Sequence, residues 1–492
     1  MFSPATAISV LVFASLVLGL MRDLMVAYFF GADWHADLYF LALIIPLFFE
    51  NSLAASLRDT LVPTFIRKRE EGTAAYHDMV ARIGGGLALV SVALVLAFAV
   101  TSGFWLKVLG GAQIGDHGSH VMAAYSIGIA MIPVVLWSYF LTSICHSESW
   151  FVLPAWRGVI FNLGAILALT FLWRSTEGLL AGMLVGQLLH ALVVQRQLRF
   201  VQLRMPMLTA RPGPDIAELL PQFLTLLAVA LLLQLGISAE RLIASWTGAG
   251  GLSRLSYAFR IVTVPLVIFG FAVVGIAYAR FSRAVAIDDR QALALAMRDT
   301  TRICLYLLLP AAVAMFVFSG ELLALLLQRG AFTESDVLHT AYVMEAYAVG
   351  LPAMGLSLVL GRLHVAVRLF RRLLLSTLLA VSLMCVAYFA VYSAWSIEGL
   401  AISTSAGAVL QCALLWITLP RDLRGILGRR DLLALAASLL LLLLVVPLCA
   451  GHGLPGILAG GVLSLLLPGG VLLLLMRREM LSTLARALGR QS

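Results

Sequence analysis

The segment ATAISVLVFASLVLGLMRDLMVAYFF (Ala5–Phe30) indicates the fold class of this protein. Its only charged residues are the adjacent Arg22 and Asp23, and apolar side chains make up most of the remainder. A helix needs ~20 predominantly apolar residues to cross the hydrocarbon core of a bilayer. The stretch therefore predicts a membrane-spanning helix. Because it lacks a basic leader, we expect a retained span and not a cleavable signal peptide.

The rest of the chain has the same character. Of its 492 residues, 61% are hydrophobic and 12% are charged, and the mean hydropathy is +1.00. Soluble domains are about half apolar and a quarter charged, so this composition excludes a disordered chain, a coiled coil and a soluble enzyme. The apolar runs are continuous and do not alternate at every second residue, which argues against a transmembrane barrel. We predict an all-α integral membrane protein.

Fourteen apolar segments are long enough to be transmembrane helices. They are 5–30, 37–66, 80–102, 120–146, 151–173, 177–198, 216–239, 252–279, 300–318, 338–361, 370–392, 397–419, 431–450 and 454–476. Gly182 and Gly186 in the sixth segment are four residues apart, a spacing that predicts close helix packing and not ligand binding.

Basic residues indicate how the spans are oriented. The net charge is +9, and 25 of the 34 Lys and Arg residues fall in alternate loops and the C-terminal tail, against five in the intervening loops. Cytoplasmic loops carry the excess of Lys and Arg. We therefore predict both termini in the cytoplasm and an even number of spans, and we assign the basic charge to membrane topology and not to nucleic-acid binding.

One loop divides the chain. The sequence RMPMLTARPGPD (Arg204–Asp215) is rich in Pro, Gly and Arg, and it separates six predicted spans from eight. We predict two six-helix lobes around a central cavity, followed by two C-terminal helices, which is a transporter plan. The predicted parts are an N-lobe at 1–203, a cytoplasmic linker at 204–215, a C-lobe at 216–420, and the last two spans with a cytoplasmic tail at 421–492.

Charged residues within spans indicate where a functional site lies. An ionised side chain at mid-bilayer costs ~2.5–3.5 kcal/mol on insertion scales, so each one is expected to face a cavity or a partner. In the first span, Ser15 and Arg22 share a helical face. The other polar groups that we expect at the cavity are Asp23, Asp37, Glu50, Gln234, Glu240 and Arg260.

Two interpretations of these charges are open. In the functional one, Arg22 and Arg260 bind a phosphate or pyrophosphate, because guanidinium pairs with such groups through two hydrogen bonds. Ser15 would lie beside them, and the four acids (Asp23, Asp37, Glu50 and Glu240) would act as a switch. In the structural interpretation, the charges are internal braces, with Arg22 paired to Asp37 or Glu50.

Nothing in the sequence predicts catalysis or a cofactor. It contains no P-loop, nucleophile elbow or catalytic dyad. Its five cysteines have no CxxC spacing, so we expect neither a zinc site nor a disulfide framework. We expect a transporter without metal or cofactor, and we leave the coupling cation open.

Several motifs resemble those of one protein family. They are LVLGLMRDLMVAYFFGADWHADLYFLALIIP (Leu16–Pro46), LVPTFIR (Leu61–Arg67), SYAFRIVTVPLVIFGFAVVGIAYARFSR (Ser256–Arg283), RGAFTESD (Arg329–Asp336) and AYAVGLPA (Ala346–Ala353). With fourteen spans and cytoplasmic termini, the chain resembles the MurJ/MviN family of lipid-linked glycan flippases, in the superfamily that includes the MATE exporters.

The resemblance implies a flippase of the bacterial inner membrane. Its substrate would be an undecaprenyl-pyrophosphate-linked saccharide, either the peptidoglycan precursor lipid II or an exopolysaccharide repeat unit, moved from the inner to the outer leaflet by alternating access. It also implies a monomer that works with glycosyltransferase or polymerase partners. Family cavity residues match Arg22, Asp23, Asp37 and Arg260. An ion-coupled MATE-like small-molecule antiporter is the alternative.

The chain departs from the family pattern at three places. Ser15-Leu16 stands where the family has Ser-Arg, and Phe49-Glu50 stands where it has a pair of arginines. The eleventh span lacks the family's asparagines and offers Ser382, with Ser403 and Ser405 in the twelfth. The first departure removes one cavity arginine of the family, and the third argues against a sodium site. The third also allows a substrate other than the peptidoglycan precursor, for example an exopolysaccharide repeat unit on the same carrier lipid.

Overall fold

The computed structural model describes residues 4–110, 114–172, 174–198, 214–269, 273–424, 429–451, 453–464 and 466–468. These residues are almost entirely helical, and no strand occurs among them. They form two compact units, one running to Ser253 with the addition of Arg329–Phe332, and one comprising Arg254–Gln328 and the chain from Thr333 onward.

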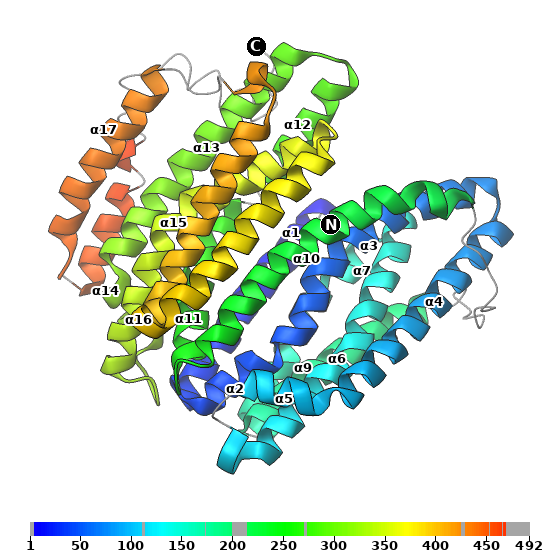
Figure 1. Ribbon diagram of the computed structural model, residues 1–492, viewed down its shortest axis with the longest axis horizontal. Coiled ribbons are helices and arrows are strands. Elements are labelled where there is room, and N and C mark those ends of the chain that lie inside the picture. The colour runs from blue at the N-terminus through cyan, green and yellow to red at the C-terminus, as the bar shows by residue number, and fades with distance from the viewer. Residues whose placement is uncertain are drawn as a thin grey trace. The chain divides into compact units, whose positions relative to one another are not determined.

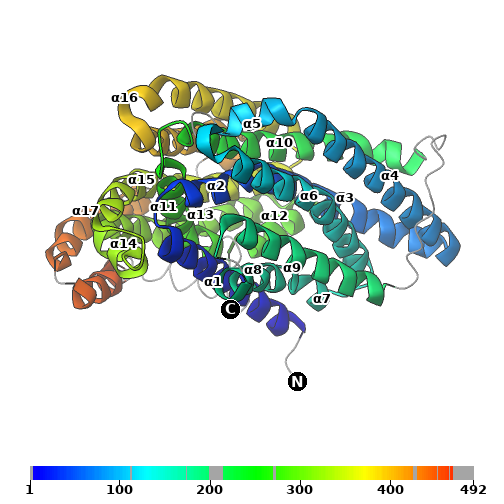
Figure 2. The ribbon, with the colours of Figure 1, turned by 90° about the horizontal axis from the view of Figure 1, so that it is seen from below.

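The first unit contains helices α1 to α10. Helix α8 lies against both α1 and α9, and α6 lies against α3 and α9 (Figure 2). The helices are α1 (Pro4–Phe30), α2 (Trp34–Ala42), α3 (Ile44–Glu71), α4 (Thr73–Val100), α5 (Ser102–Gly110), α6 (Ile114–Ser147), α7 (Val152–Ala155), α8 (Arg157–Leu167), the π-helical η2 (Ala168–Leu172), α9 (Thr176–Gln197) and α10 (Pro214–Ala244).

Small residues allow a close contact between α8 and α9. A Cβ built on Gly186 would lie 2.6 Å from the carbonyl oxygen of Ile160, and one built on Gly182 would overlap the backbone at Gly164. Only glycine permits this approach of α9 to α8. The predicted packing role of Gly182 and Gly186 is confirmed.

The second unit contains the remaining helices, with α13, α15 and α16 running side by side (Figure 1). A capping box, in which Thr333 and Asp336 satisfy each other's backbone N–H groups, begins α15. The helices are α11 (Gly251–Phe269, in this unit from Arg254), α12 (Gly275–Ala286), α13 (Arg290–Val317), α14 (Ser319–Leu327), α15 (Glu334–Ala366), α16 (Phe370–Thr418), the 3-10 helices η4 (Arg421–Leu423) and η5 (Val446–Cys449), and α17 (Arg429–Val445).

The predicted all-α membrane fold is confirmed. Among the described residues, eleven helices are long and apolar enough to cross a bilayer. Large apolar side chains also point outward, among them Val100 at 85% exposure and Phe171 at 76%. Such an apolar exterior is typical of a protein whose solvent is lipid.

The number of spans is not confirmed as fourteen. The predicted spans 370–392 and 397–419 lie in one long helix, α16, which bends at Ser396 where φ is 49°. The last two predicted spans correspond to the shorter helices Leu435–Cys449 and Gly453–Pro468, and residues 469–492 lie outside the described chain.

The predicted linker falls largely outside the described residues, which resume at Pro214. Helix α10, predicted as the first span of the C-lobe, packs on α3 and belongs to the first compact unit. The division into six-helix lobes at 204–215 stays a prediction.

Candidate functional site

Arg22 lies in α1 with its side chain 11% exposed. Its Nε and Nη2 donate to Oδ1 of Asp23 at 2.9 and 2.8 Å, and its Nη1 donates to Oδ1 of Asn162 at 2.9 Å. The rings of Tyr39 and Phe161 lie 5.9 and 6.0 Å from the guanidinium carbon. A buried positive charge is therefore balanced by one carboxylate and held in a fixed plane by a second helix.

Asn162 is buried in α8, and its amide is held from both ends. Its Nδ2 donates to the carbonyl oxygens of Gly158 at 2.8 Å and Ser15 at 3.2 Å, which leaves Oδ1 to accept from Arg22. A Cβ on Gly158 would collide with the Ser15 hydroxyl, so this glycine allows α1 to approach α8. Ser15 thus contributes its backbone carbonyl to the group around Arg22.

A second ionic cluster joins α3, α6 and α8. Nη2 of Arg157 donates to Oε1 of Glu50 at 2.7 Å and also to the hydroxyl oxygen of Tyr139. The Tyr139 hydroxyl in turn donates to Oε1 of Glu50 at 3.1 Å, and the Arg157 guanidinium lies 4.4 Å from the Tyr139 ring centroid. We call Glu50, Tyr139 and Arg157 the Arg157 cluster.

Asp37 in α2 is 1% exposed and has a different role. Its Oδ2 accepts from the backbone N–H of Gly250 and its Oδ1 from that of Ser253, each at 2.7 Å. These N–H groups are at the start of α11, where a helix has unsatisfied donors and the positive end of its dipole. Asp37 therefore fixes the first turn of α11.

The structure decides between the predicted ion pairs. The structural interpretation paired Arg22 with Asp37 or Glu50, and this pairing is wrong. The guanidinium of Arg22 instead forms its ion pair with the carboxylate of the next residue, Asp23, at 2.8 Å. Glu50 instead pairs with Arg157, which comes from a helix 107 residues further along the chain.

The remaining predicted residues lie apart from these clusters. Glu240 and Gln234 are buried in α10, at 2% and 4% exposure. Arg260 is partly buried in α11, within the second unit. Its position relative to Arg22, and the central cavity between the lobes, stay predictions.

Sequence reasoning missed Asn162, Tyr139 and the role of Arg157. An arginine inside the fifth predicted span, with an asparagine five residues later, was the available signal. Arg157 has no acidic residue within a helical turn, and Asn162 is uncharged, so their partners were not predictable from spacing.

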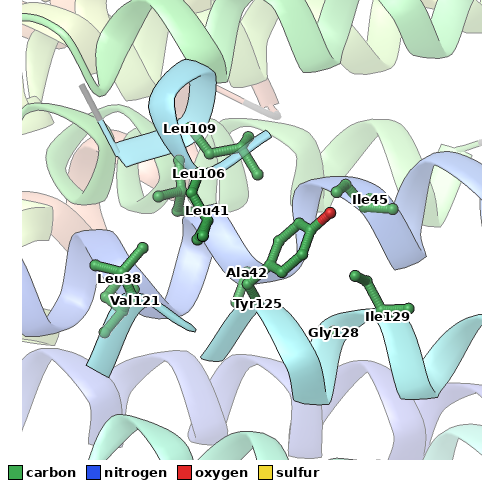
Figure 3. A pocket seen from close by; sticks show the side chains of 10 residues that line it. All are labelled: Leu38, Leu41, Ala42, Ile45, Leu106, Leu109, Val121, Tyr125, Gly128 and Ile129. Atoms are coloured by element: carbon green, nitrogen blue, oxygen red, sulfur yellow. The ribbon is translucent and has the colours of Figure 1, made fainter. Parts of the chain in front are cut away.

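An apolar pocket lies elsewhere in the first unit. Its lining comes from α2, α3, α5 and α6 and includes Leu38, Leu109 and Ile129 (Figure 3). The one polar side chain in the lining, Tyr125, donates its hydroxyl to the carbonyl of Phe98 at 2.8 Å. With no charged group, this pocket is unsuited to an anionic headgroup. No group of three or more His, Cys, Asp or Glu residues suited to a metal occurs in the described part of the chain.

Comparison with known proteins identifies the family to which this chain belongs. The family model described as "Lipid II flippase MurJ" matches residues 26–471. The chain belongs to the MurJ family. The resemblance found in the sequence motifs is thereby confirmed, and the MurJ family is one of transporters.

Individual MurJ relatives are distant but cover most of the chain. The "Probable lipid II flippase MurJ" of Vibrio cholerae serotype O1 is 25% identical over 426 residues, which are 83% of this chain and 81% of that protein. The "Lipid II flippase MurJ" of Burkholderia cenocepacia is 24% identical over 71% of this chain and 70% of its own length.

Solved structures show the fold that MurJ proteins share with drug exporters. A lipid II flippase MurJ in an inward closed conformation superposes with a TM-score of 0.78 at 20% identity, covering 95% of this chain and 98% of that one. An inward-facing multidrug resistance MATE family transporter gives 0.69 at 14% identity, covering 82% and 93%. The fold is therefore common to MurJ proteins and MATE transporters. The match to the family model, and not the fold, assigns this chain to the MurJ family.

Proposed function

We propose that this protein flips lipid II, a polyprenyl-pyrophosphate-linked saccharide, from the inner to the outer leaflet of the bacterial inner membrane during peptidoglycan synthesis. Membership of the MurJ family supports this substrate, and no feature of the chain favours an exopolysaccharide unit over it. The apolar helices support a multi-pass membrane location.

Arg22 is the observation that carries the proposal. An arginine within a spanning helix costs several kcal/mol unless it is paired or hydrated. Here one carboxylate and one amide hold it in a fixed orientation, within a helix that is long and apolar enough to cross a bilayer. A planar guanidinium suits the paired oxygens of a pyrophosphate.

Arg22 and Arg260 would bind the pyrophosphate, with Ser15 beside Arg22. Asp23 would act as the exchangeable partner, because both of its hydrogen bonds with Arg22 use the same carboxylate oxygen. Glu50 and Glu240 are further acids of the pathway. Asp37 is assigned to holding α11, since both of its oxygens are occupied by backbone N–H groups.

The proposed mechanism is alternating access by a monomer with both termini in the cytoplasm. The membrane potential acts on charged groups with ~2.3 kcal/mol per charge per 100 mV. This energy would favour the inward-directed state of an empty, arginine-bearing pathway. A glycosyltransferase or polymerase partner would use the flipped product.

Complementation tests the proposal. We expect this chain to rescue a bacterium depleted of its own peptidoglycan flippase, and Arg22→Ala and Arg260→Ala to fail while reaching the membrane in normal amounts. Arg22→Lys should fail too, because one ammonium cannot reach both Asp23 and Asn162 as the planar group does. Rescue by Arg22→Ala would contradict the assigned role. Drug efflux by the wild-type chain without rescue would favour the antiporter.

A further inference from the structure

Arg157 has hydrogen-bonding capacity that the fold does not use. Only its Nη2 donates to described residues, to Glu50 and Tyr139. Its Nε and Nη1 make no hydrogen bond within the described part of the chain, although the side chain is only 20% exposed. By contrast, Arg22 uses Nε, Nη1 and Nη2. Three N–H donors of Arg157 are thus available to a ligand.

Glu50 occupies the place that an anionic ligand would take. One of its oxygens, Oε1, accepts from both Arg157 and Tyr139. The stronger arrangement for a guanidinium and a carboxylate uses two parallel bonds. The pair here uses a single guanidinium nitrogen, Nη2. The N–H groups of Nε and Nη1, which lie on opposite sides of the guanidinium, are therefore each open to an oxygen of a second anion.

Tyr139 holds the guanidinium in position. The ring centroid lies 4.4 Å from the guanidinium carbon, and the hydroxyl bonds to both charged partners. This contact would persist if the carboxylate moved away, because a cation over an aromatic face is attracted without a counter-ion. Arg157 therefore has a support that is independent of Glu50.

The Arg157 cluster adjoins the group around Arg22. Helix α8 carries Arg157 at its first residue and Asn162 five residues later, a rise of about 7.5 Å along the axis. The two guanidiniums thus lie in one part of the first unit, each neutralised by its own acid.

We propose that Arg157 is a further anion-binding residue of the transport pathway, beside Arg22 and Arg260, and that Glu50 is an internal competitor which the substrate's pyrophosphate displaces. This inference rests on the proposed function. It assigns specificity for a pyrophosphate-bearing lipid to Arg157 on α8, with Glu50 on α3 as its exchangeable partner.

Binding to the full-length protein in lipid nanodiscs tests the inference, with undecaprenyl pyrophosphate as the probe and undecaprenol as its uncharged counterpart. Arg157→Gln should weaken binding of the pyrophosphate by on the order of ten-fold, which corresponds to about 1.4 kcal/mol. Glu50→Gln should strengthen it several-fold, because the competing charge is removed. Binding of undecaprenol should not change.

The double variant Glu50→Gln/Arg157→Gln separates this role from a structural brace. A brace loses stability when either partner is removed and recovers when both are neutral. If Arg157 binds the anion, the double variant should bind as weakly as Arg157→Gln. Recovery of wild-type binding in the double variant, or no gain in Glu50→Gln, would overturn the inference.

Two comparisons keep the outcomes distinct. Arg174→Gln is the matched control, since it removes an exposed arginine that stacks on Phe29 in the same unit and should leave binding unchanged. If Arg22→Ala weakens binding and Arg157→Gln does not, only this inference fails. If the wild-type chain neither binds the pyrophosphate nor rescues the depleted host, the proposed function fails as well.

Discussion

Replacing Asp37 with alanine should release the first turn of α11. The carboxylate accepts two backbone N–H groups, from Gly250 and Ser253, at 2.7 Å in a site that is 1% exposed. Loss of a helix N-cap costs about 0.5–2 kcal/mol. A buried donor left without its partner costs about 1–3 kcal/mol. We therefore expect Asp37→Ala to destabilise the protein by roughly 2–4 kcal/mol, and Asp37→Asn, which keeps one acceptor oxygen, by about half of that.

Hydrogen exchange of the purified protein measures this effect locally. The amides of residues 250–255 should exchange faster in Asp37→Ala, and the unfolding temperature should fall by several degrees. Asp33→Ala is the matched control, because Asp33 caps α2 through His35 N–H at 2.7 Å but is 47% exposed, so water replaces the lost bond. Unchanged exchange at 250–255 in Asp37→Ala would refute the capping role. Equal effects of the two variants would refute the argument from burial.

Two further predictions concern packing and topology. Gly186→Ala should lower stability by roughly 1–3 kcal/mol through overpacking and reduce the amount of folded protein in the membrane, because its Cβ would lie 2.6 Å from the Ile160 carbonyl oxygen. Gly86→Ala in α4 is the control and should have no such effect, because a Cβ there meets nothing within 4 Å. Equal thermal stability of the two variants would contradict the packing argument. In a cysteine-free background, Lys107→Cys should react with an impermeant maleimide in intact spheroplasts, and Glu70→Cys should react only after permeabilisation. Both positions are exposed and lie in loops predicted on opposite sides of the membrane. The reverse pattern of labelling would contradict the predicted orientation.

Local sequence was sufficient to predict the spanning helices and the close contact that the glycines of α9 make. An apolar run such as that of α1 must satisfy its backbone groups internally in lipid, so its length and composition alone predict a spanning helix. The spacing of Gly182 and Gly186 likewise predicts a close contact, since both residues lie on one face of α9. These properties depend on residues that are near one another in the chain.

The partners of the charged side chains could not be predicted from local sequence. Arg22 meets Asn162 across 140 positions, Glu50 meets Arg157 across 107, and Asp37 accepts from the Gly250 N–H across 213. Each contact depends on which helices are neighbours and on how each is rotated about its axis. Neither property is encoded by the pattern within a single span.

The amino-acid sequence by itself therefore determined a helical membrane protein and marked the charged residues that need an explanation. The tertiary structure alone decided that Asp37 holds α11, that Asn162 orients Arg22, and that Arg157 is neutralised by Glu50 while most of its donors remain available. The physical reason is that the insertion of a helix into lipid depends on the sum of its own side chains, whereas the state of a buried charge depends on the atoms that other helices bring within about 3 Å.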